Sequence, residues 1–207
     1  MLPFSDQKPT RRAPVVTPLL IAANILVFLW QYHYGVNRSV KLAGFMPVEL
    51  HPLTYAGFEH LFTSMFMHGG ALHLMGNMLF LWVFADNVED EIGRVKFLGF
   101  YLLCGVVAGL THALCKPFSH IPVVGASGAI SGVLGAYLLL HPTDRFLRIP
   151  AWVWLLLWIG LQVFNFANSD PGRAGIAYGE HVGGFMTGVF LAICHRLRKK
   201  PGTPSPR

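Results

Sequence analysis

A serine between glycines and a distant histidine are the residues whose types and spacing are best suited to chemistry. Ser127 stands in the segment Gly-Ala-Ser-Gly at 125–128, and His181 follows 54 residues later, each inside an apolar stretch. Polar groups at membrane depth are costly and usually mark function. A hydroxyl and an imidazole are the minimum parts of an activated serine nucleophile. The pair therefore favours peptide-bond hydrolysis within a bilayer.

Each half of this pair also has a plainer interpretation. Gly128 and Gly132 form a GxxxG pair, which is common where membrane helices pack closely. His181 is followed by a second such pair, Gly184 and Gly188, and taken alone is compatible with a buried imidazole bonded to a backbone carbonyl. Two thin helices can, however, approach closely enough for the hydroxyl–imidazole hydrogen bond of about 2.6–3.2 Å that catalysis needs.

A third polar group lies earlier in the chain. His73 and Asn77 are four residues apart and share one face of a helix. Two such donors suit the oxyanion of a tetrahedral intermediate; an interhelical polar clamp is the alternative. A metal pair with His68 is disfavoured, because the spacing of five lacks the HExxH pattern and no cysteine is near. We expect no metal and no other cofactor.

The composition shows which elements must position these residues. The chain is 53% hydrophobic and 13% charged, against about 25% charged in a soluble domain, which predicts an all-α polytopic protein of the lipid bilayer. The net charge of +6 resides in short loops and tails, which argues against a nucleic-acid partner. The three cysteines form no CxxC pair and imply no disulfide framework.

Six apolar segments are expected to form the bundle. They cover approximately residues 15–30, 73–88, 97–111, 121–140, 149–167 and 181–194. Six spans place both termini on one side, together with 12 of the 16 Lys and Arg residues, and leave four on the other. The positive-inside rule then predicts cytoplasmic termini.

The expected domain organisation follows from these spans. Residues 1–14 form a cytoplasmic tail, 15–197 the six-helix membrane domain and 198–207 a second cytoplasmic tail. The long first outer connection, from about residue 31 to 72, is rich in aromatic and apolar residues and is expected to be partly embedded. No cleavable signal peptide is evident, and a multi-pass protein of the bacterial inner (plasma) membrane is favoured. The sequence shows no internal repeat of the kind that many transporters have, which argues against a transporter.

The three motifs occur in the order HxxxN, GxSG and HxxGxxxG across residues 62–191. In this arrangement the chain resembles the rhomboid family of intramembrane serine proteases. The resemblance implies a six-transmembrane-helix rhomboid-like bundle that cuts the transmembrane segments of single-pass or other membrane proteins. Ser127 would be the nucleophile and His181 the general base and acid. Asn77 and His73 would form the oxyanion hole with the backbone N–H of Ser127.

The resemblance extends to supporting residues. His68 matches a histidine that supports the first outer loop, and Glu89, four residues before Gly93, matches a structural position at the cytoplasmic end of the second span. The glycine-rich connection at 169–179 would form a mobile cap over a water-filled cavity. Substrate helices must unwind to be cut, so small or helix-breaking residues are expected near the cleaved bond.

In the first outer loop the chain departs from the family pattern. Many members carry Trp-Arg where this chain has Glu59 and His60, although the following Thr63 is retained. The substitution changes how the loop is anchored and leaves the two expected catalytic residues in place.

Near the expected catalytic residues there are two further departures. Ser131 stands where a tyrosine is sometimes found; we expect Ser127 to attack, because it lies near a helix N-terminus that favours a developing anion. Glu180 stands where a small residue is common, and we expect it to face the outer aqueous boundary. Adjacent helical side chains point about 100° apart, so Glu180 is poorly placed to orient the imidazole of His181 as the acid of a triad. A Ser–His dyad is therefore predicted. The alternative is an inactive rhomboid-like protein that binds membrane helices.

Overall fold

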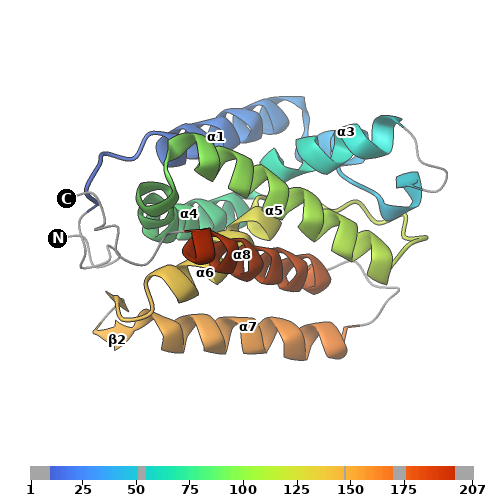
Figure 1. The fold of residues 1–207 in the computed structure, drawn as a ribbon. Helices are drawn as coiled ribbons and strands as arrows, with labels where there is room; N and C mark the ends of the chain where they lie inside the picture. Colours follow the sequence, from blue (N-terminus) through green and yellow to red (C-terminus); the bar gives the residue numbers. More distant parts are fainter. Residues whose placement is uncertain (1–9, 51–54, 147, 170–175, 199–207) are drawn as a thin grey trace.

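The computed structural model describes residues 10–50, 55–146, 148–169 and 176–198, which form a helical bundle (Figure 1). Its long helices are α1 (Val16–Tyr34), α4 (Ala71–Ile92), α5 (Arg94–Cys115), α6 (Ser127–Leu140), α7 (Ala151–Ala167) and α8 (Tyr178–Arg198). The predicted all-α bundle of six long helices is confirmed. α1 begins and α8 ends at the same end of the bundle (Figure 1). Residues 1–9 and 199–207, in the predicted tails, lie outside the described residues.

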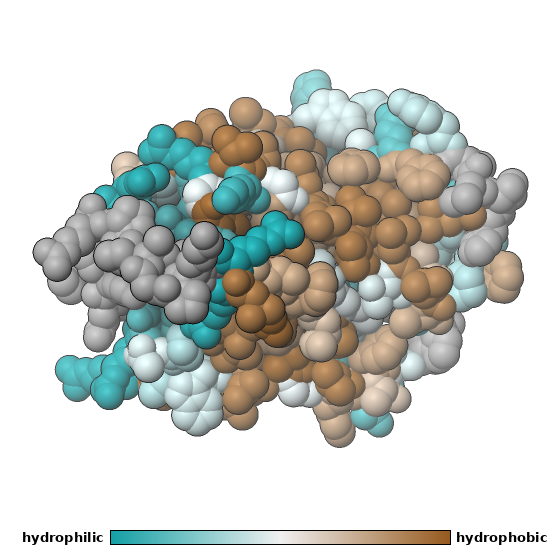
Figure 2. Space-filling model, viewed as in Figure 1, coloured by the Kyte–Doolittle hydropathy of each residue, from teal (hydrophilic) through white to brown (hydrophobic). Residues whose placement is uncertain are grey.

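The surface of the bundle is that of a membrane protein. α1, α4 and α5 are long and apolar enough to cross a bilayer by length and composition, whereas α6 and α7 are shorter apolar helices. Large apolar side chains such as Leu19, Leu157 and Phe190 are mostly exposed. In Figure 2 apolar residues cover the middle of the visible face, and hydrophilic residues gather toward the end where α1 begins. Lipid contact accounts for this band, since water does not favour so large an apolar surface.

The inward face of α1 is polar, and its first turn is fixed by a carboxylate from α4. Glu89 is buried and accepts hydrogen bonds from the backbone N–H groups of Val15, Val16 and Thr17 at 2.8, 3.0 and 2.8 Å. The Thr17 hydroxyl donates a fourth bond at 2.8 Å. These N–H groups have no partner within a helix, so the predicted structural interpretation of Glu89 agrees with the contacts.

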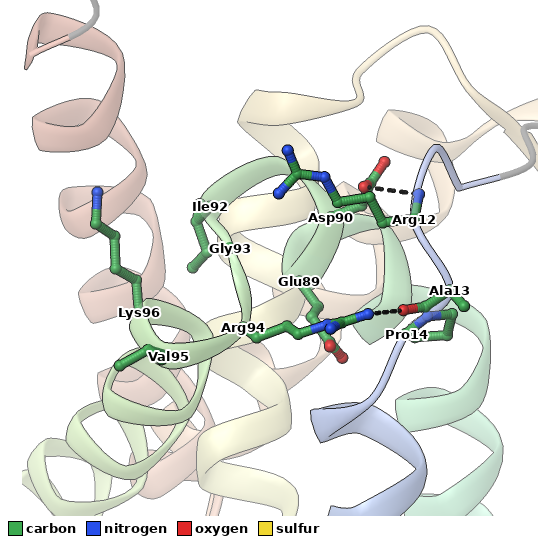
Figure 3. Close-up of a pocket in the computed structure, with 10 residues that line it drawn as sticks. All are labelled: Arg12, Ala13, Pro14, Glu89, Asp90, Ile92, Gly93, Arg94, Val95 and Lys96. Carbon is green, nitrogen blue, oxygen red and sulfur yellow. Dashed lines mark hydrogen bonds between the residues drawn. The ribbon is translucent and has the colours of Figure 1, made fainter. Parts of the chain in front are cut away.

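A pocket of about 490 Å³ adjoins this contact at the same end of the bundle (Figure 3). Its acidic groups are already engaged: the Asp90 carboxylate accepts the backbone N–H groups of Arg11 and Arg12 at 2.8 and 3.2 Å. Arg94 donates to the carbonyl of Ala13 at 2.9 Å. We assign this pocket to the packing of the chain that precedes α1 against the α4–α5 turn.

α6 is the central helix, and it begins later than predicted. Its residues from Gly128 to Tyr137 are all buried, and it packs against α4, α5 and α8. The sequence predicted a start near residue 121, but 121–126 run outside the helix. Val123 pairs with Phe45 as an isolated β-bridge, and the N–H of Gly125, at φ 137°, bonds to the carbonyl of Ser64. These bonds replace helical ones and put the helix N-terminus at Ser127.

The first outer connection is partly embedded, as predicted. It contains α2 (Val36–Ala43), α3 (Tyr55–Thr63) and the 3-10 turns η1 (Pro47–Leu50) and η2 (Ser64–Phe66). Phe45 and Leu61 form a small core with Ala113 near the end of α5. At the other end of the bundle, a short antiparallel hairpin, β1 (Arg145–Phe146) and β2 (Ile149–Pro150), joins α6 to α7.

The loop has its own anchors in place of the Trp-Arg pair. His60 Nδ1 is 2.9 Å from a carboxylate oxygen of Glu49, and the Thr63 hydroxyl donates to the carbonyl of Ala43 at 2.9 Å. Gln31 of α1 bonds to both backbone groups of His68, accepting its N–H at 2.8 Å and donating to its carbonyl at 3.2 Å. Burial, with the neighbouring His73 ring, lowers the pKa of His68 to about 4. A neutral His68 therefore supports the loop where it enters α4.

Candidate active site

Glycines bring α6 and α8 into backbone contact. A Cβ on Gly184 would lie 2.0 Å from the carbonyl oxygen of Gly128, and one on Gly188 would lie 1.9 Å from that of Gly132. Neither glycine has a positive φ, so the requirement is for space rather than for backbone conformation. The two GxxxG pairs therefore face each other and hold the N-terminal halves of α6 and α8 together.

This contact places the two predicted catalytic side chains side by side. Ser127 Oγ lies 2.8 Å from His181 Nε2, within hydrogen-bond distance. The hydroxyl of Ser131 is fully buried and donates to the backbone carbonyl of Ser127 at 2.6 Å. Of the two serines, Ser127 is thus the one whose hydroxyl faces the imidazole.

The second nitrogen of His181 has a partner that the sequence analysis missed. Nδ1 lies 2.8 Å from Oε1 of Gln162 on α7. The rings of Trp158 and Tyr178 also contact the imidazole, with centroids 5.9 and 6.4 Å away. The signal for Gln162 was present: an amide within a mostly apolar segment, seven residues after Leu155 and on the same helix face.

His73 and Asn77 lie on the opposite wall, on the first turns of α4. The N–H of Gly69 points to His73 Nδ1 at 3.4 Å; an accepting Nδ1 places the proton of a neutral ring on Nε2. The ring lies against Gly125, where a Cβ would be 2.9 Å from Nε2 and 3.5 Å from Ser127 Oγ. Asn77 is buried, and within the described part of the chain its Nδ2 has no hydrogen-bond partner. Both side chains can therefore donate to a group held next to Ser127.

A cavity of about 630 Å³ connects these residues. It is lined by all four predicted site residues, together with apolar side chains that include Phe80 and Trp158. Its volume is within the range of small-ligand sites, about 300–1,000 Å³. Most of the connection predicted to form a cap, residues 170–175, lies outside the described residues.

The prediction that Glu180 faces the outer aqueous boundary is wrong. Its side chain is buried, with Cγ 2.9 Å and Oε1 3.0 Å from the position of a Cβ on Gly128, and it also lines the cavity. The absence of a side chain on Gly128 leaves the room that the carboxyl group occupies. It approaches α6 rather than Nδ1 of His181, which is bonded to Gln162.

Comparisons with known proteins agree with this architecture. The rhomboid domain profile matches residues 56–198. Rhomboid protease GluP of Bacillus subtilis is 34% identical over 200 residues, which are 95% of this chain and 37% of that protein. RHOMBOID-like protein 5 of Arabidopsis thaliana is 31% identical over 147 residues, 71% of this chain and 47% of that protein.

A mitochondrial relative extends the comparison. The presenilin-associated rhomboid-like protein of Mus musculus is 28% identical over 203 residues, 89% of this chain and 50% of that protein. The chain thus spans half or less of the length of these relatives. The profile match covers most of the helical bundle, including every motif described above. The chain is a multi-pass membrane protein that belongs to the rhomboid family.

Proposed function

We propose that this protein is an intramembrane serine endopeptidase that cleaves transmembrane segments of other membrane proteins with a Ser127–His181 dyad. The observation that carries the proposal is the 2.8 Å contact between Ser127 Oγ and His181 Nε2 in a cavity of about 630 Å³ inside the bundle. The family supports it, because the Bacillus relative is named as a protease.

The proposed reaction uses groups that line the cavity. Neutral His181 takes the Ser127 proton at Nε2 while Oγ attacks the scissile carbonyl carbon. Nε2–H of His73, the Asn77 amide and the N–H of Ser127 donate to the oxyanion. His181 then returns the proton to the leaving amine, which departs as the acyl-enzyme forms. Water then enters the cavity, gives a proton to His181 Nε2 and attacks the acyl carbon. The bond from that carbon to Ser127 Oγ breaks, His181 returns the proton to Oγ, and the carboxylic acid product leaves.

The proposed location is a bacterial inner membrane with both termini in the cytoplasm. The orientation is supported by the distribution of basic residues, 12 on the side of the termini and four on the other. In this orientation the proposed dyad, which is near the end of the bundle opposite the start of α1, lies toward the outer side of the membrane. Fusing a reporter that is active on only one side of the membrane to the C-terminus tests the orientation.

The function is tested by cleavage of a single-pass model substrate with purified protein in liposomes. Ser127→Ala and His181→Ala should each lower kcat by about 10³-fold or more. Ser131→Ala is the matched control, because its hydroxyl is bonded to a backbone carbonyl, and it should retain activity within a few-fold. Equal cleavage by wild type and Ser127→Ala would refute the assignment of the nucleophile. If wild type neither cleaves nor reacts with a fluorophosphonate, the helix-binding, non-proteolytic alternative replaces the proposal.

A further inference from the structure

α7 carries one buried amide that the two-residue mechanism leaves without a role. The buried residues of this helix are Ala151, Leu155 and Gln162, and most of its remaining side chains face outward. A polar side chain within a membrane-spanning helix is costly and is retained where it has a task. Packing alone would be served better by leucine at position 162, so the amide calls for a chemical explanation.

The contact between Gln162 and His181 determines which ring nitrogen carries the proton. An amide oxygen can only accept a hydrogen bond, so at 2.8 Å from Gln162 Oε1 the Nδ1 atom of His181 must be the donor. The neutral ring is then unprotonated at Nε2, the atom 2.8 Å from Ser127 Oγ. This is the tautomer that a general base for the Ser127 proton requires.

The other groups around the ring do not supply this function. Trp158 and Tyr178 contact the imidazole through their rings. The carboxyl group of Glu180 lies beside Gly128 on α6. Within the described part of the chain, Gln162 is the side chain that bonds to Nδ1.

We propose that Gln162 is a positioning residue that holds His181 in its reactive tautomer and orientation, making the site a Ser–His–Gln arrangement. The inference rests on the proposed function. When Nε2 takes the Ser127 proton, the imidazolium keeps its Nδ1–H bond to the amide oxygen, and no proton passes to Gln162. Gln162 acts only through His181 and touches no reacting atom.

The test compares three variants in liposomes. Gln162→Leu removes the acceptor at similar size, Gln162→Glu keeps an acceptor oxygen at the same reach, and Leu155→Ala is a control that weakens the same α7 face without contacting His181. For each variant, kcat, KM, the rate of fluorophosphonate labelling and the melting temperature are measured across a range of pH. The nitrogen NMR spectrum of histidine-labelled protein reports the tautomer of His181.

We expect Gln162→Leu to lower kcat and the labelling rate about tenfold, the effect of one lost neutral hydrogen bond, with KM unchanged. The NMR spectrum should lose the Nδ1–H form of His181. Gln162→Glu should recover most of the rate at the alkaline end of the pH range, where its carboxylate is the acceptor. Leu155→Ala should lower the melting temperature while the rate per folded molecule stays near wild type.

Two results would overturn the inference: wild-type kcat and an unchanged His181 tautomer in Gln162→Leu, or losses of rate that follow melting temperature equally in all three variants. Failure of the proposed function is separable from both. A wild type that neither cleaves nor labels refutes the protease, while the NMR comparison of wild type with Gln162→Leu still decides whether Gln162 sets the tautomer.

Discussion

The backbone contact between α6 and α8 leads to a sharp prediction for Gly184. Replacing it with alanine puts a Cβ 2.0 Å from the carbonyl oxygen of Gly128. Both atoms are fixed to helical backbone, so no side-chain rotation relieves the overlap. Reaching an ordinary separation of about 3.4 Å requires the helices to part locally by about 1.4 Å.

Such a displacement acts directly on the dyad. Gly184 lies one helical turn after His181, and Gly128 follows Ser127 directly. A displacement of about 1.4 Å along the line that joins the two side chains would stretch the 2.8 Å contact to about 4.2 Å, beyond the limit of a hydrogen bond. Misplacement by about 1 Å can cost roughly 100-fold in rate, so we expect kcat to fall by at least that factor.

The assay is substrate cleavage and fluorophosphonate labelling of Gly184→Ala in liposomes, with thermal unfolding measured in parallel. Gly160→Ala in α7 and Gly99→Ala in α5 are matched controls, because a Cβ there meets no atom within 4 Å; both should behave like wild type. A Gly184→Ala protein that melts and labels like these controls would refute the argument that the α6–α8 contact sets the site geometry.

Two further predictions concern a structural contact and the oxyanion donors. Glu89→Ala removes four hydrogen bonds to the start of α1 and, at about 1 kcal/mol each before water replaces some of them, should lower the free energy of unfolding by about 3 kcal/mol. Thr17→Val removes one of these bonds and should cost about 1 kcal/mol; equal losses in reversible detergent unfolding would contradict the assignment. Asn77→Ala should lower kcat about 100-fold with little change in KM or melting temperature, and an unchanged kcat would exclude Asn77 as an oxyanion donor.

The fold was predictable because a bilayer leaves few choices. Backbone groups in lipid must form their hydrogen bonds within helices, so each apolar segment predicts one helix of the bundle. The positions of Ser127 and His181 within such segments then predict that both side chains lie inside the bundle. The start of α6 was predicted six residues too early, because residues 121–126 are apolar but bond to the first outer loop instead. Hydropathy describes solvent preference and carries no information on such pairing.

The motifs that predicted the pairing of Ser127 with His181 did not predict the contacts that support it. Gln162 and Gln31 are amides within mostly apolar helices, and only tertiary packing shows that one reaches His181 and the other His68. The loop anchor between Glu49 and His60 depends on irregular backbone, for which no simple periodicity exists. Close approach of α6 and α8, by contrast, was signalled directly by the glycine spacing.

The contact of Glu89 with the start of α1 also has a consequence for biosynthesis. The acceptor for the N–H of Thr17 is 72 residues further along the chain, so α1 leaves the ribosome well before the group that completes its first turn. At roughly 5–20 residues per second, α1 waits on the order of 4–15 seconds for α4. During that interval its polar inward face, with Asn24 and Gln31, has no bundle to pack against. α1 is apolar enough to enter the bilayer by itself, but its first turn meets the Glu89 carboxylate only when α4 arrives, so we expect the pairing of these two helices to be an early step in assembly.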